Sequence, residues 1–179
     1  MSKQIFTVFL LGMVSIVSLN IDAAPTGRPR PVANGPKGTV KLSVELNPTG
    51  SFVAESAQVN GFARKVADGY VAQNVSLVLN TLKTGIDLRD RHMLLNYFET
   101  KKYPYAILVN AKAGSGGRFK GILKVRNMPQ PIEGEYSVNG SNLEATFKSK
   151  LSTYRIRKAA YMGVGVEDEV EVKVTLPVR

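Results

Sequence analysis

The strongest constraint on the fold is a period-two alternation of apolar and polar side chains that begins at Thr39 and recurs to the end of the chain. In its first run, Val40, Leu42, Val44 and Leu46 alternate with polar residues. Since successive side chains of a strand point to opposite faces of a sheet, this pattern predicts a half-buried β-strand. Most of the chain is therefore expected to form strands with one apolar face.

Similar runs follow, separated by turns rich in glycine, asparagine and proline. Strands are predicted over residues 39–46, 51–59, 70–79, 105–113, 119–125, 132–138, 143–151 and 170–176, with a less regular stretch at 154–161. A helix over 51–65 stays open as an alternative, and Met128–Pro131 is expected to interrupt the strands. Short strands joined by tight turns are typical of a sandwich or barrel. The long alternating runs favour an all-β fold, a meandering barrel of about eight antiparallel strands.

The N-terminus has the layout of a secretory signal peptide: Lys3, a mostly apolar run from Ile5 to Leu19, and small residues at Ala23 and Ala24. A membrane span takes about 20 predominantly apolar residues, and this run is shorter and broken by polar ones. We expect residues 1–23 to be removed, which leaves no transmembrane segment. Residues 24–38 contain four prolines and three glycines and are predicted to be a linker. One barrel domain, residues 39–179, follows.

The composition excludes several kinds of chemistry. There is no cysteine, so disulfides, thiol catalysis and thiolate metal sites are ruled out. The chain has 24 Lys and Arg against 14 Asp and Glu, a net charge of +10. Such a surface attracts anionic lipid headgroups or cell-wall polymers, or simply keeps the protein soluble. Nucleic acid is not an expected partner of an exported chain.

One segment departs from the strand pattern, and a short helix is predicted near residues 86–97. Asp87 is expected to cap it, with Asp90 at the third helical position, as in a capping box. Leu88, His92 and Leu95 fall on one face of such a helix. The helix is expected either to close one end of the barrel or to border the mouth of a cavity.

No catalytic signature is found. His92 is the single histidine of the chain and lacks the second imidazole that most zinc sites use. Residues 113–117 approach a nucleophile elbow but lie between two strands, where a hairpin loop is expected. The acidic run at 167–169 lacks the ligand spacing of a calcium loop. We expect no catalytic residue, no metal and no cofactor, and therefore a protein that is not an enzyme.

The candidate binding residues are the apolar side chains on the inward faces of the strands. Such residues ordinarily form a core, and they form a ligand site only if the barrel is too wide for them to fill. The inward set is predicted to be Phe52, Leu77, Leu79, Ile107, Val109, Phe119, Leu123, Tyr136 and Phe147.

The segment that contains the predicted helix combines the run Thr84–His92 with Phe98 and Glu99 and with Lys102–Pro104. These residues resemble the signature of the YceI-like family of bacterial periplasmic proteins, and the resemblance extends more weakly from about Gly38 to Leu176. It implies an extended eight-stranded lipocalin-like barrel. It also implies an apolar tunnel for a polyisoprenoid chain, such as an isoprenoid quinone or a polyprenyl lipid.

Two functions are therefore considered. The first is an exported carrier, periplasmic or secreted, that sequesters a polyisoprenoid, with Arg89, His92 and Tyr103 at the cavity mouth. The second is a barrel with a solid core whose basic surface binds an anionic partner at the cell envelope. A homodimer is compatible with either.

Overall fold

The computed structural model describes residues 37–158, 160–161 and 164–179. Its strands are β1 (Lys37–Asn47), β2 (Ser51–Asn60), β3 (Arg64–Val66), β4 (Gly69–Ala72), β5 (Val75–Val78), β6 (Tyr105–Gly114), β7 (Arg118–Val125), β8 (Met128–Asn139), β9 (Asn142–Lys150), β10 (Ala160–Tyr161) and β11 (Val164–Pro177). The helical elements are η1 (Leu79–Thr81), α1 (Asp87–His92), η2 (Met93–Tyr97) and η3 (Leu151–Tyr154). The predicted signal peptide and residues 24–36 of the predicted linker lie outside the described residues.

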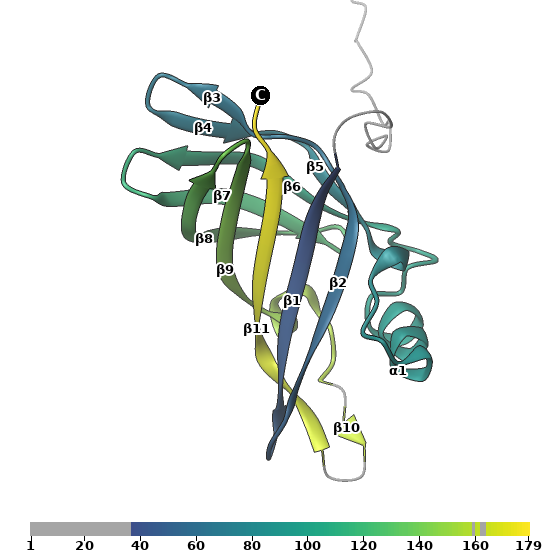
Figure 1. Ribbon diagram of the computed structural model, residues 1–179. Coiled ribbons are helices and arrows are strands. Elements are labelled where there is room, and N and C mark those ends of the chain that lie inside the picture. Colours follow the sequence, from purple (N-terminus) through teal and green to yellow (C-terminus); the bar gives the residue numbers. More distant parts are fainter. Residues whose placement is uncertain (1–36, 159, 162–163) are drawn as a thin grey trace, which may run out of the picture.

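Eight strands form a closed antiparallel barrel, in the order β6-β5-β2-β1-β11-β9-β8-β7, and β7 pairs back to β6. The β3–β4 hairpin extends the barrel wall at one end, because β4 pairs with the last residues of β6 and β5 pairs with its first residues. Strand β10 pairs with the start of β11. Figure 1 shows the β3–β4 hairpin and the C-terminus at one end of the molecule, and β10 at the other. The prediction of an all-β, eight-stranded antiparallel barrel with one short helix is confirmed.

The alternation in the sequence sets the inner face of the barrel. Between β1 and β11, Leu42 lies opposite Val172, and both side chains face inward. In the adjacent pair, Lys41 lies opposite Lys173, and both side chains face outward. The two lysines face solvent, and each pairs with a carboxylate on its other side: Lys41 Nζ lies 3.1 Å from Glu55, and Lys173 Nζ lies 2.8 Å from Glu144. A register shift of one residue would bury these charges, so the pattern specifies the register.

One sequence-based expectation about the strands is wrong in detail. Residues 70–79 do not form one strand: Asn74 adopts a positive φ of 52° and separates β4 from β5, although both pair with β6. The strand expected over residues 51–59 is present as β2, so the alternative of a helix over 51–65 is excluded.

The expected break at Met128–Pro131 is also wrong, because β8 runs straight through it. Pro129 lies opposite Lys124 and Pro131 opposite Ile122 on β7, whereas β8 begins to pair with β9 only at Gly134. Proline has no backbone N–H to donate, and a strand tolerates it where no second neighbour needs that donor. The chain reverses just before, at Arg126 and Asn127, which have φ values of 51° and 60°.

The helix predicted near residues 86–97 is present, but its start is built differently. The N-cap is Ile86, which makes no side-chain cap, and Asp87 does not cap the helix. Asp90 instead turns back to the preceding loop, where it accepts hydrogen bonds from Thr84. After α1 the chain continues through one π-helical turn, η2, to Tyr97. Figure 1 shows the helical segment lying beside the barrel, next to β2.

Candidate functional site

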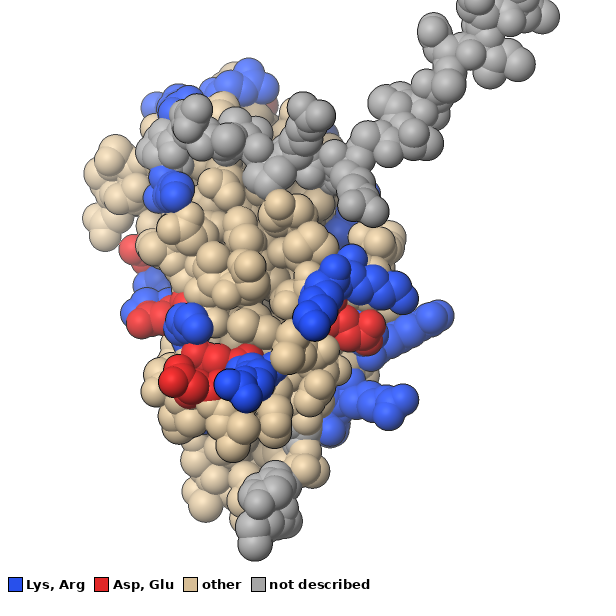
Figure 2. Space-filling view, turned by 90° about the vertical axis from the view of Figure 1, so that its right-hand side faces the viewer, with Lys and Arg blue, Asp and Glu red and all other residues tan. Residues whose placement is uncertain are grey.

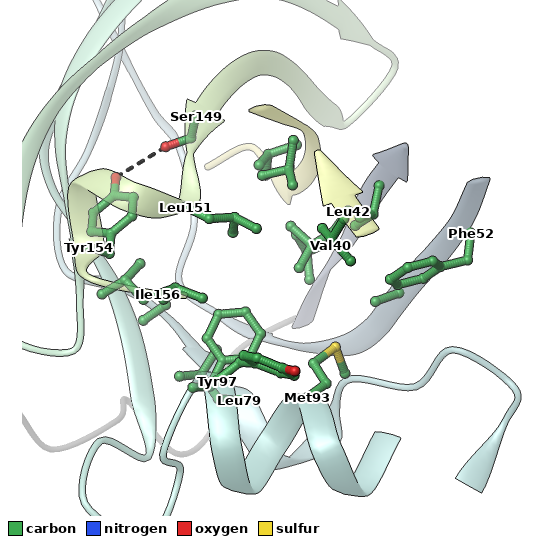
Figure 3. Close-up of a pocket in the computed structure, with 18 of the residues that line it drawn as sticks. Val40, Leu42, Phe52, Leu79, Met93, Tyr97, Ser149, Leu151, Tyr154 and Ile156 are labelled. Carbon is green, nitrogen blue, oxygen red and sulfur yellow. Dashed lines mark hydrogen bonds between the residues drawn. The ribbon is translucent and has the colours of Figure 1, made fainter. Parts of the chain in front are cut away.

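The barrel interior contains a cavity of about 1050 Å³. This volume is at the upper end of the range typical of ligand sites. Figure 3 shows side chains from β1, β2, the helical segment and η3 pointing into the same space. Valines and leucines of β1 and β11 make up much of its wall: Val40, Leu42, Val44, Leu46, Val166, Val170, Val172 and Val174.

The cavity exists because the inward side chains of several strands are short. Ala54 on β2 and Ala106 on β6 are buried and line the space, and the inward residues of β1 and β11 are mostly valines. Alanine and valine side chains cannot meet across a barrel of eight strands, whose interior is wide enough to hold one small ligand. The interior predicted by the solid-core hypothesis is therefore not observed.

Two aromatic rings close the inner end of the cavity. Phe147 and Phe119 pack edge to face, with ring centroids 5.9 Å apart. Phe147 borders both the cavity and a space of only about 40 Å³ behind it, whereas Phe119 borders only the smaller space. Gly134 makes room for the pair, since a Cβ there would lie 2.8 Å from the Phe147 Cβ. The cavity is thus blind at this end.

The helical elements supply the side wall. Met93, Tyr97 and Phe98 contribute from η2 and its C-cap, and Leu151, Tyr154 and Ile156 from η3 and the residues after it. The Ser149 hydroxyl donates to the Tyr154 phenol oxygen at 3.3 Å (Figure 3). Burial raises the pKa of Tyr154, and the hydrogen bond from Ser149 opposes this only in part. The wall is therefore apolar with one neutral polar pair.

The exposed residues among the cavity lining mark its opening. They are Ile86, Leu88, His92, Asn96, Lys150, Arg157, Ala160 and Val164. Arg89 lies just inside them: its guanidinium carbon is 4.3 Å from the centre of the Phe52 ring, and its Nε donates to the Thr84 hydroxyl at 3.0 Å. No Asp or Glu lines the cavity within the described part of the chain. The opening therefore combines apolar side chains with cations.

Asp90 holds the helical segment in position beside this opening. Its carboxylate is buried and accepts two bonds of 2.7 Å from Thr84, one from the backbone N–H and one from the hydroxyl, and Lys83 Nζ lies 3.6 Å away. Burial alone would raise the pKa of Asp90. The hydrogen bonds from Thr84 and the charge of Lys83 outweigh it, so the pKa lies below its ordinary value. The carboxylate is thus a structural anion.

The structure brings five of the nine predicted lining residues into the cavity wall: Phe52, Leu77, Leu79, Leu123 and Phe147. Phe119 lies behind Phe147, as described. Tyr136 packs against Tyr70 with centroids 6.0 Å apart, and its hydroxyl donates to the Gly114 carbonyl at 2.7 Å, away from the cavity.

Ile107 and Val109 were predicted to face inward, and this is wrong. Their neighbours Ala106 and Leu108 line the cavity instead, so Ile107 and Val109 are on the outer face of β6. Residues 105–109 are apolar without exception, and no alternation indicates which side of this strand faces the interior.

Of the three predicted mouth residues, Arg89 and His92 line the opening and Tyr103 does not. The Tyr103 ring lies 5.0 Å from Lys102 Nζ and 5.7 Å from the guanidinium carbon of Arg126. Arg126 in turn forms an ion pair with Glu99. Tyr103 therefore belongs to a cluster that fixes the end of the helical segment to the β7–β8 turn.

Sequence reasoning missed the two largest groups of lining residues. The alternation of β1 and β11 was visible in the sequence and would have found their inward valines. Met93 and Tyr97, four residues apart, share a helical face and could have been found as well. Leu151, Tyr154 and Ile156 follow no period, so no local signal marks them.

Within the described residues, no group of three or more His, Asp or Glu side chains is placed to hold a metal ion. In the same residues, no helix has the length and apolar character that a bilayer span requires.

A closed antiparallel barrel with an apolar cavity and a helical segment at its opening defines a β-barrel binding protein. The model of the YceI-like domain matches residues 36–178, so this chain belongs to the YceI-like family. No curated protein matches the chain.

Solved structures share the fold. BcnA from Burkholderia cenocepacia is 14% identical, with a TM-score of 0.59 over 76% of this chain and 94% of that one. A polyisoprenoid binding domain from Saccharophagus degradans, implicated in plant cell wall breakdown, is 15% identical, with a TM-score of 0.55 over 77% of this chain and 91% of that one.

Proposed function

We propose that this protein is an exported carrier that holds a polyisoprenoid lipid in its barrel and performs no chemistry on it. The observation that carries the proposal is the 1050 Å³ cavity, whose lining is mostly apolar and, among the residues that the structure describes, includes no carboxylate. Burying one methylene group contributes about 0.8 kcal/mol, so a long hydrocarbon chain gains affinity from these walls without specific polar contacts.

The comparisons support the class of ligand. The chain belongs to the YceI-like family, and a structure with the same fold is described as a polyisoprenoid binding domain. The apolar run at 5–19 supports export to the periplasm or beyond, through a cleaved signal peptide. An isoprenoid quinone and a polyprenyl lipid both fit the proposal.

Neighbouring residues of β6 allow a matched test. Ala106 points into the cavity and Ile107 points away from it. We expect Ala106→Phe to fill part of the cavity and displace the lipid, and Ile107→Phe to leave it bound. Mass spectrometry of organic extracts of the purified proteins measures the lipid per protein chain, and circular dichroism checks that each variant is folded.

The expected result is at least one polyisoprenoid species in extracts of the wild type and of Ile107→Phe, reduced severalfold in Ala106→Phe. Extracts that repeatedly contain no lipid, from protein purified without detergent, would overturn the proposal.

The alternative of a filled barrel that acts through its basic surface has less support. It requires a packed interior, and the cavity disagrees with that requirement. The cavity does not account for the net charge of +10.

A further inference from the structure

Apolar side chains are exposed around the opening of the cavity. Ile86 is 53% exposed, Leu88 61% and Val164 42%, and all three border the opening. They come from the start of the helical segment and from the start of β11, which are remote in sequence. Single exposed apolar residues are common, but a group of them around one opening marks an interaction site.

Cations accompany these apolar residues. Arg89 and Arg157 border the opening, and neither forms an ion pair with any described residue. Lys150 also borders it, and its positive charge contributes, after the hydrogen bonds from Ser152, to lowering the pKa of the nearby Asp168. In Figure 2, which looks onto the side that carries α1, the tapering lower part is mostly uncharged, and basic side chains together with some acidic ones lie beside and above it.

We propose that this opening is a docking surface for an anionic phospholipid bilayer. Exposed apolar side chains enter the boundary between headgroups and acyl chains, while arginines beside them contact lipid phosphates. The cavity wall is apolar from the opening inward, so a chain leaving the bilayer would enter the barrel without crossing water. The charge is complementary, because the protein carries +10 and no described acidic residue lines the opening.

A soluble protein partner fits these features less well. The exposed apolar residues continue directly into the lining of the cavity, so the same chemistry faces the occupant inside and the surface outside. The inference goes beyond the proposed function, since docking concerns the outer rim and does not depend on which ligand the barrel holds.

The chain has no tryptophan, which allows a site-specific test with the full-length protein. Leu88→Trp places the single indole of the protein at the opening. The matched control is Ile122→Trp, on β7, where the native side chain is also exposed and does not border the cavity. Both proteins are sedimented with vesicles of phosphatidylglycerol and phosphatidylcholine, and with vesicles of phosphatidylcholine alone. Tryptophan emission and its quenching by brominated phospholipid are then measured in the pellet and in the supernatant.

We expect the indole at position 88 to shift to the blue and to be quenched in anionic vesicles, and the indole at position 122 to do neither. Each indole reports only its own surroundings, so vesicle binding through another part of the chain would not produce the blue shift or the quenching at position 88. A shift confined to protein that stays in the supernatant would report uptake of single lipids into the cavity and would overturn the docking proposal. Equal signals at the two positions would also overturn it.

The contribution of charge is tested separately. A basic residue at an anionic surface strengthens partitioning about fivefold. Arg157→Gln is expected to weaken sedimentation with the anionic vesicles by about that factor. Arg64→Gln, an exposed arginine on β3 away from the cavity, is expected to change it little. Equal losses in both variants would show that net charge alone attracts the protein, which would overturn the assignment to the opening. Cavity lipid retained in Arg64→Gln and Ile122→Trp, whose residues do not border the cavity, distinguishes this result from a failure of the proposed function.

Discussion

Asp90 is an acidic residue whose role is decided by its neighbours. In the sequence it stands in a charged run beside the only histidine, a setting that suggests chemistry. In the structure its carboxylate accepts two hydrogen bonds from Thr84 and lies near Lys83. His92 forms no hydrogen bond with it. The bonds from Thr84 join the loop before α1 to the fourth residue of the helix. Asp90 therefore determines where the rim of the cavity lies.

The Asp90 network predicts a defined dependence of stability on pH. Because the pKa of Asp90 is lower in the folded protein than in the unfolded chain, its carboxylate stabilises the fold above the ordinary pKa of about 3.9. This stabilisation is lost as the pH falls through the depressed folded value. Asp90→Asn is expected to lower the free energy of unfolding at pH 7 by about 1–3 kcal/mol, since the two hydrogen bonds from Thr84 lose their charged acceptor and an amide N–H replaces the oxygen that faces Lys83.

Urea unfolding at pH 7 and at pH 3 measures this effect. The difference between wild type and Asp90→Asn should shrink at the lower pH. Asp87→Asn is the control, because Asp87 lies on the same helix but is exposed and forms no hydrogen bond to Thr84. An Asp87→Asn variant as destabilised as Asp90→Asn would contradict the explanation.

At the scale of elements, the period-two runs predicted most strands, and the failures have identifiable causes. Strand β6 could not be oriented, because residues 105–109 are apolar on both faces. The prolines of β8 suggested a break, but the missing β9 neighbour at that point makes them acceptable. The η3 wall has no sequence period, since its residues are brought to the cavity by tertiary packing. Local patterns thus specify which side chains of a strand face inward, and they do not specify which residues lie opposite them across the barrel.

The Phe119–Phe147 pair is the element that sets the depth of the cavity. Phe147→Ala is expected to join the cavity to the small space behind it and to admit lipids with longer chains. Phe119→Ala leaves Phe147 in place and should not change the chain length. Both substitutions remove a buried aromatic ring and should cost about 3–5 kcal/mol of stability.

Mass spectrometry of the lipids that copurify with each variant gives the distribution of chain lengths. A shift toward longer chains in Phe147→Ala alone supports the closing role of this ring. The same distribution in the wild type and both variants would contradict it, provided that unfolding curves show folded protein.

At the scale of the whole molecule, a hollow barrel forgoes part of the packing that stabilises a filled one. No disulfide compensates for this, because the chain has no cysteine. A ligand that binds only the folded state adds RT ln(1 + [L]/Kd), which is about 2.7 kcal/mol at a concentration 100 times Kd. On the proposed function, the bound lipid is therefore part of the structural stability of the protein.

Removal of the lipid should lower the melting temperature of the wild type, and readdition should restore it. Calorimetry of extracted and reloaded protein measures the shift. Ala106→Phe, whose introduced ring occupies part of the cavity, should show a smaller shift of the melting temperature on addition of lipid. A melting temperature of the wild type that is insensitive to lipid would contradict the linkage.

The cavity is closed at one end by Phe147 and open at the other beside α1. Among the described residues the cavity opens on one side, so on the proposed function a donor that loads the barrel and an acceptor that empties it would use the same side. The two would then compete for one carrier molecule. Transfer through this protein would then be a shuttle with two separate encounters, and its rate would depend on how quickly the carrier leaves the first partner.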